Sequence, residues 1–103
     1  MKKQNEKLIR DKIPQIAKSN GSDIDFRVAD SSEYWEFLKR KLKEECNEYL
    51  ESEELEELAD ILEVIDAIVF HKSIDLNQLQ ALKFKKHKKR GGFKKRFIMK
   101  GVS

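Results

Sequence analysis

Apolar residues recur at helical spacing through residues 34–82, and this periodicity limits the fold more than any other feature of the chain. With about 100° of rotation per residue, one arc of the segment 31–50 holds Tyr34, Trp35, Leu38, Leu42, Cys46 and Tyr49. A wider apolar face follows, made of Leu55, Leu58, Ile61, Leu62, Ile65, Ile68 and Val69. The pattern predicts a mostly α fold with a helical hairpin at its centre.

Capping signals predict where the two hairpin helices begin. Asp30 stands before the first helix with Glu33 at the third helical position, a spacing typical of a capping box. We expect this helix to cover residues 31–50. Ser52 lies in the polar corner and is predicted to cap the second helix, which runs to about residue 71.

The remaining elements are shorter. Asp75, with Gln78 three residues later, predicts a third helix that ends near residue 90, before Gly91 and Gly92. The only proline, Pro14, predicts a short helix over residues 14–19 and favours an extended Ile13. The segments "DFRVA" (25–29) and "FKKRFIM" (93–99) are predicted to pair as a small two-stranded β element.

Composition limits the class of protein. The length of 103 residues indicates a single domain, residues 1–103. No apolar run is long enough for a membrane span or a signal peptide, so we expect a cytoplasmic protein that does not enter a membrane. Cys46 has no second cysteine to pair with and lies among apolar positions, which favours a buried thiol.

Acids gather in one part of the chain. Residues 44–66 hold nine Glu and two Asp and no Lys, Arg or His, although the formal net charge of the protein is +3. A solvated hairpin and a cage for divalent cations both fit this composition. Glu45 falls inside the apolar arc of the first helix, and Glu48 lies at its edge. On the second helix, Glu57 and Asp60 form a similar pair beside the apolar face.

The two acid pairs converge if the helices pack antiparallel across a short corner. Four carboxylates brought together repel one another and lose solvation unless a cation neutralises them. Hard oxygen ligands favour Mg²⁺ or Mn²⁺, and Mg²⁺ often joins carboxylates to phosphate oxygens. The spacing therefore makes Glu45, Glu48, Glu57 and Asp60 candidate metal ligands, and a solvated acidic hairpin stays open as the alternative.

Three stretches resemble one protein family. Glu44-Glu45-x-x-Glu48 with Glu57-x-x-Asp60 resembles the EExxE and ExxD motifs of the MazG-like group of all-α nucleoside triphosphate pyrophosphohydrolases. "KLIRDKIP" (7–14) and "KKRGGFKKRFIM" (88–99) are similar to the KLVRDKIP opening and the RGGF ending of one branch. Only eight residues separate Glu48 from Glu57, fewer than in many members, which implies a tight corner.

The resemblance implies an enzyme that hydrolyses nucleoside triphosphates between the α and β phosphates, as in the removal of non-standard or surplus nucleotides. Glu45, Glu48, Glu57 and Asp60 would bind Mg²⁺, with Mn²⁺ as the alternative ion. Glu44 would stand beside them, either as an acid that supports the metal ligands or as a base that orients the attacking water. A bound metal ion neutralises phosphate oxygens and lowers the pKa of its water.

The basic end of the chain is open to two interpretations. Residues 83–100 contain eight Lys, two Arg and no acid, as a solvated tail also would. The functional interpretation places Lys86, Arg90 and the backbone of Gly91 and Gly92 against the triphosphate. Arg10 and Lys12 are further candidates for the same contact.

Two other expectations concern partners. The apolar faces around Trp35 and Ile65 are too broad for one chain to cover, which predicts a homodimer or a dimer of dimers that completes a four-helix bundle. The alternative function is a basic-tailed helical module that binds nucleic acid or another partner without catalysis. The small number of aromatic residues in the tail argues against nucleic acid.

Overall fold

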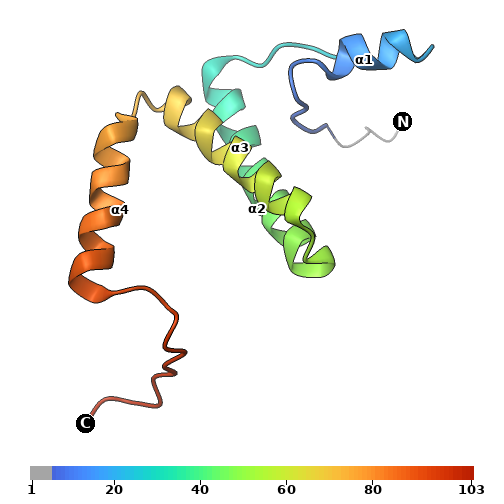
Figure 1. Ribbon diagram of the computed structural model, residues 1–103. Helices are drawn as coiled ribbons and strands as arrows, with labels where there is room; N and C mark the ends of the chain where they lie inside the picture. The colour runs from blue at the N-terminus through green and yellow to red at the C-terminus, as the bar shows by residue number, and fades with distance from the viewer. Residues whose placement is uncertain (1–5) are drawn as a thin grey trace.

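Four helices make up the ordered framework of the protein in the computed structural model, which describes residues 6–103. Helices α2 (Ser31–Ser52) and α3 (Leu55–His71) lie side by side as a hairpin. Helix α1 (Ile13–Ser19) precedes the hairpin, and α4 (Leu76–Arg90) extends away from it (Figure 1). The predicted mostly α fold with a central helical hairpin is confirmed.

The corner between α2 and α3 is as tight as its length implies. Glu53 adopts a left-handed backbone with φ of 57°, and its N–H donates to the carbonyl of Tyr49 at 2.7 Å. Ser52 is the last residue of α2 and lies two positions before Glu54, the N-cap residue of α3. The prediction that Ser52 caps α3 was therefore wrong. Its hydroxyl instead accepts a hydrogen bond at 3.2 Å from the N–H of Glu54, the residue that precedes α3.

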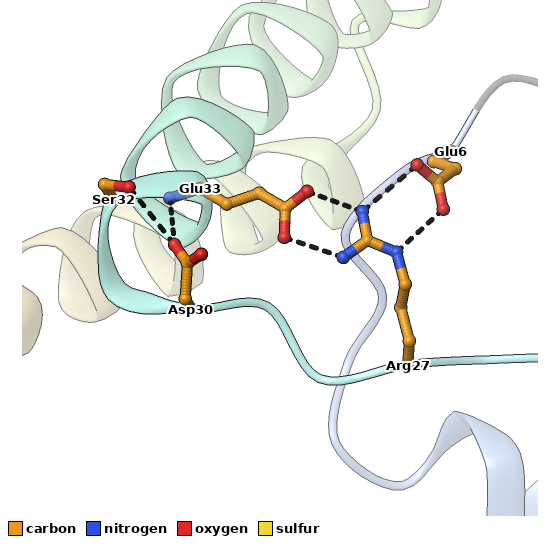
Figure 2. A network of polar contacts seen from close by, with 5 residues as sticks. All are labelled: Glu6, Arg27, Asp30, Ser32 and Glu33. Carbon is orange, nitrogen blue, oxygen red and sulfur yellow. Dashed lines mark hydrogen bonds and ion pairs between the residues drawn. The ribbon is translucent and has the colours of Figure 1, made fainter.

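Two aspartates cap helices as predicted. Asp30 Oδ1 accepts the backbone N–H of Glu33 at 2.9 Å and the hydroxyl of Ser32 at 3.1 Å (Figure 2). Asp75 Oδ1 accepts the backbone N–H groups of Asn77 and Gln78 at the start of α4. Each carboxylate thus satisfies N–H groups that have no partner inside the helix.

The Glu33 side chain does not complete a capping box. Both of its oxygens accept hydrogen bonds of 2.6 Å from the guanidinium of Arg27. Arg27 also donates to Glu6, at 2.9 Å and 3.1 Å, so it links the N-terminal segment to the first turn of α2 (Figure 2). The paired carboxylates raise the pKa of Arg27, and Arg27 in turn lowers the pKa of Glu33.

Two local predictions were wrong. No strand forms within residues 6–103, so the segments 25–29 and 93–99 do not pair. The first is anchored by the Arg27 side chain, and the second follows α4 away from the hairpin (Figure 1). Ile13 is helical rather than extended, because α1 begins there and Pro14 occupies its first turn, where a missing N–H costs nothing.

The hairpin buries little apolar surface. Within residues 6–103 the buried apolar side chains are Leu38 on α2 and Val64 on α3. A stripe along α3 stays in contact with solvent, and it includes Leu55, 81% exposed, and Leu62, 63% exposed. None of the described helices combines the length and the apolarity needed to cross a bilayer.

Candidate metal centre

Glu45 lies at the centre of the acidic cluster, on the side of α2 that faces α3. Its side chain is only 7% exposed, as expected for an acid inside the apolar arc. Oε1 lies 3.4 Å from Nζ of Lys41, one helical turn earlier. Oε2 is buried and has no hydrogen-bond partner in residues 6–103. A buried carboxylate oxygen is costly unless a donor, a water or a cation binds it.

A first group of ligand atoms comes from α2. Glu44, Glu45 and Glu48 each place one carboxylate oxygen within 4.8 Å of the other two. Their spacing explains this arrangement, because residues three and four apart lie on the same face of a helix. Lys41 contacts this group as well, with Nζ 3.6 Å from Oε2 of Glu44.

A second group joins the two helices. Glu45, Glu57 and Asp60 also place one carboxylate oxygen each within 4.8 Å of one another. Like Glu45, Glu57 holds a buried Oε2 that lacks a hydrogen-bond partner in the described range. The four predicted ligands thus lie in two groups that share Glu45: Glu48 belongs to the group on α2, and Glu57 and Asp60 belong to the group that spans both helices.

The charge of Glu45 is disfavoured where it stands. Burial is the main cause that raises the pKa of its carboxyl, and the neighbouring Glu48 raises it further. Lys41 acts in the opposite direction but does not cancel these effects. A positive ion at the cluster would remove the repulsion and supply a partner for the free oxygen.

Arg10 reaches the edge of the same cluster. One of its guanidinium nitrogens lies 2.6 Å from Oδ1 of Asp60, although 50 positions separate the two residues in sequence. The N-terminal segment is thus placed beside α3. Lys12, the other predicted substrate contact from this segment, is exposed at the start of α1.

The donor set fits a hard divalent cation. Every candidate ligand is a carboxylate, which suits Mg²⁺ or Mn²⁺ rather than a metal that prefers nitrogen or sulfur. Two of these carboxylates, on Glu45 and Glu57, each have a buried oxygen with no hydrogen-bond partner among residues 6–103. Asp66 belongs to neither group within the described residues.

The predicted phosphate contacts on α4 are not brought to this cluster within one chain. Lys86 and Arg90 lie in the last part of α4, which points away from the hairpin (Figure 1). Gly91 has φ of 81° and its N–H donates to the carbonyl of His87, so a local role in ending the helix explains this glycine. A Cβ at Gly92 would meet the His87 ring at 3.2 Å.

The sequence pattern did not lead us to predict two features of the site. One is Lys41, although its spacing of three and four residues from Glu44 and Glu45 is the signal that could have identified it. A shallow cavity of about 390 Å³ also borders the first acid group; it is lined by Arg40, Lys43, Glu44, Asn47, Glu48 and Glu51.

Comparison of the chain with family models, with curated proteins and with solved structures gave no match.

Proposed function

We propose that this protein is a Mg²⁺-dependent nucleoside triphosphate pyrophosphohydrolase. The observation that carries the proposal is Glu45, which has a buried Oε2 without a hydrogen-bond partner in residues 6–103 and whose carboxylate belongs to both acid groups. Resemblance of the acid motifs, of "KLIRDKIP" and of the RGGF ending to MazG-like enzymes supports the choice of reaction. The substrates are nucleoside triphosphates, and the products are a nucleoside monophosphate and pyrophosphate.

In this mechanism the two helices hold the charges that the reaction needs. Glu45, Glu48, Glu57 and Asp60 would hold the ion, which when bound would neutralise phosphate oxygens and activate water. Glu44 orients the attacking water and accepts its proton. The water oxygen bonds to the α phosphorus, the bond from that phosphorus to the bridging oxygen breaks, and pyrophosphate leaves with the bridging oxygen.

Cations of the chain complete the site. Arg40 and Lys43 line the cavity beside Glu44 and Glu48, where a phosphate tail can lie next to a bound ion. Arg10 pairs with Asp60, which belongs to the group that spans both helices. These positive groups next to the carboxylates reduce the repulsion that a triphosphate would meet there.

A second copy of the chain is part of the proposal. The stripe of Leu55, Leu58, Leu62 and Ile65 on α3 is too apolar and too exposed for a hairpin that stays alone. We assign this stripe to a homodimer contact, with a dimer of dimers as the larger form. Such an enzyme would act in the cytoplasm on non-standard or surplus nucleotides.

The activity is tested with a panel of ribonucleoside and deoxyribonucleoside triphosphates. Pyrophosphate and monophosphate release is measured with Mg²⁺, with Mn²⁺ and with a chelator. We expect equal amounts of both products with either metal and none with the chelator. Release of inorganic phosphate instead of pyrophosphate, or turnover that continues in the chelator, would contradict the proposed reaction.

A second candidate function is favoured by the exposure of α4 and the segment after it. All ten Lys and Arg of residues 83–100 are exposed, and the stretch holds no acid. Such a stretch can bind nucleic acid phosphates by releasing counterions. Labelled oligonucleotides titrated at several salt concentrations test this candidate, because phosphate contacts predict an affinity that falls steeply with salt.

A further inference from the structure

We infer that Arg10 is a built-in counter-cation of the carboxylate cluster, which a divalent ion displaces, and that the freed guanidinium then binds a phosphate oxygen of the substrate. The inference rests on the proposed function, because it gives one residue of that site two successive partners. It couples the occupancy of the metal site to the position of a substrate contact.

The contact with Asp60 is the first support. The Arg10 guanidinium lies 2.6 Å from Oδ1 of Asp60, and Asp60 belongs to the group of acids that joins α2 to α3. Arg10 therefore supplies positive charge at the place where a metal ion would supply it. The side chains of the pair are 56% and 38% exposed, so an incoming ion can reach the aspartate.

The contact is also weak enough to exchange. An ion pair between exposed side chains contributes little free energy, because water solvates both partners and salt screens them. A divalent ion held by several carboxylates at once gains more, and it takes over the oxygen that Arg10 holds. Arg10 and the ion consequently compete for Asp60.

The backbone keeps Arg10 near the cluster after its side chain is displaced. The carbonyl of Arg10 accepts the N–H of Ile13 at 3.1 Å, which ties it to the start of α1. On the other side, Glu6 is held by Arg27, which is itself bound to Glu33 on α2 (Figure 2). The segment is thus fixed at both ends, and only the side chain of Arg10 needs to move.

A phosphate is the partner that fits the freed side chain. The guanidinium has a planar set of N–H donors that can hold two phosphate oxygens at once. A bound divalent ion recruits the phosphates to the cluster, so the phosphate oxygens come within reach of the displaced Arg10 guanidinium. Metal binding then prepares the substrate contact, and substrate binding in turn favours the displaced state.

The test uses the full chain and three variants. Calorimetry with Mn²⁺ alone, without nucleotide, gives the metal affinity of the unchanged protein, Arg10→Gln, Arg10→Lys and Lys39→Gln. Lys39→Gln is the matched control, because it also removes an exposed ion pair, with Glu36, but touches neither the cluster nor the segment that carries Arg10. We expect about two- to five-fold tighter metal binding for Arg10→Gln only, the change that corresponds to loss of one exposed ion pair. Arg10→Lys keeps the competing charge and the unchanged affinity.

Nucleotide kinetics test the second half of the inference. Arg10→Gln and Arg10→Lys should both raise KM about ten-fold, because a lysine cannot form the two-point contact, while Lys39→Gln leaves KM unchanged. Metal affinity that is equal in the unchanged protein and in Arg10→Gln would overturn the inference and leave the proposed function standing. Absence of metal binding in the unchanged protein would overturn both.

Discussion

Lys41 lies one helical turn before Glu45, and its Nζ is 3.4 Å from Oε1 of that glutamate. Despite this cation, the pKa of Glu45 is raised, because burial and the nearby Glu48 outweigh it. One oxygen of Glu45 is therefore paired, while Oε2 is buried and has no hydrogen-bond partner within residues 6–103. The balance of these interactions still disfavours the ionised form of Glu45.

This balance predicts how stability depends on pH without metal. Because the folded protein raises the pKa of Glu45, folding favours the protonated form, and the ionised form costs stability as pH rises above the ordinary value of 4.5. Glu45→Gln should therefore be more stable than the unchanged protein at pH 7 in a chelator. The difference should shrink as pH falls and vanish below 4.5. Urea unfolding at several pH values, at one protein concentration, measures it.

Glu63→Gln provides the control for this experiment, since Glu63 is an exposed residue of α3 outside both acid groups. Its stability should follow that of the unchanged protein across the pH range. A Glu45→Gln variant that is less stable at pH 7, or a difference that grows toward acid, would show that Lys41 dominates the energetics of Glu45.

The cap at the start of α2 predicts a second pH effect, of opposite sign. The N–H of Glu33, followed by the Ser32 hydroxyl, lowers the pKa of Asp30 below its ordinary value. Its stabilisation is present above that value and is lost as pH falls through the lowered pKa. Asp30→Ala should thus lower the urea midpoint at pH 7, and the loss should become smaller toward pH 3.

Two further variants serve as comparisons for the effect of Asp30→Ala on the urea midpoint. Arg27→Gln removes exposed ion pairs and should lower the midpoint less than Asp30→Ala, because water replaces such pairs at little cost. Asp25→Ala removes an exposed acid of the same loop and should leave the midpoint unchanged. A larger loss for Arg27→Gln than for Asp30→Ala would mean that the N-terminal segment, rather than the cap, stabilises the hairpin.

The exposed stripe of α3 predicts self-association. Light scattering at micromolar concentration should give the mass of two chains or four. Leu62→Lys places a charge in the stripe, where Leu62 is 63% exposed and can be changed without opening a cavity, and it should shift the mass toward one chain. Glu63→Lys, the next residue on α3, should keep the assembled mass. A single-chain mass for the unchanged protein would contradict the assignment of this stripe.

Local signals were sufficient for much of the fold. Asp30 and Asp75 cap α2 and α4 because their carboxylates satisfy the first free N–H groups, a rule that depends only on neighbouring residues. Glu45 could be placed on the buried side because 3.6 residues complete a helical turn. The same rule put Glu57 and Asp60 on one face of α3.

Contacts between distant segments could not be read in this way. Arg10 meets Asp60 across 50 positions, and no periodicity in the sequence relates them. The alternation in residues 25–29 favoured a strand, yet Val28 is 90% exposed and the segment is held by the Arg27 side chain instead. A strand needs a partner at the right distance, and the sequence pattern alone supplies only one side of that pair.

The central claim is that the position of a carboxylate, rather than the amount of negative charge, makes the site. Glu56 and Glu57 test it most directly, because they are adjacent on α3 and chemically identical, and only Glu57 belongs to an acid group. Pyrophosphate release at saturating Mg²⁺ and nucleoside triphosphate should fall at least about 100-fold in Glu57→Gln. In Glu56→Gln it should stay within about two-fold of the unchanged protein, as for other exposed acids. Equal activity of the two variants would contradict the metal site and leave the hairpin as a solvated acidic surface.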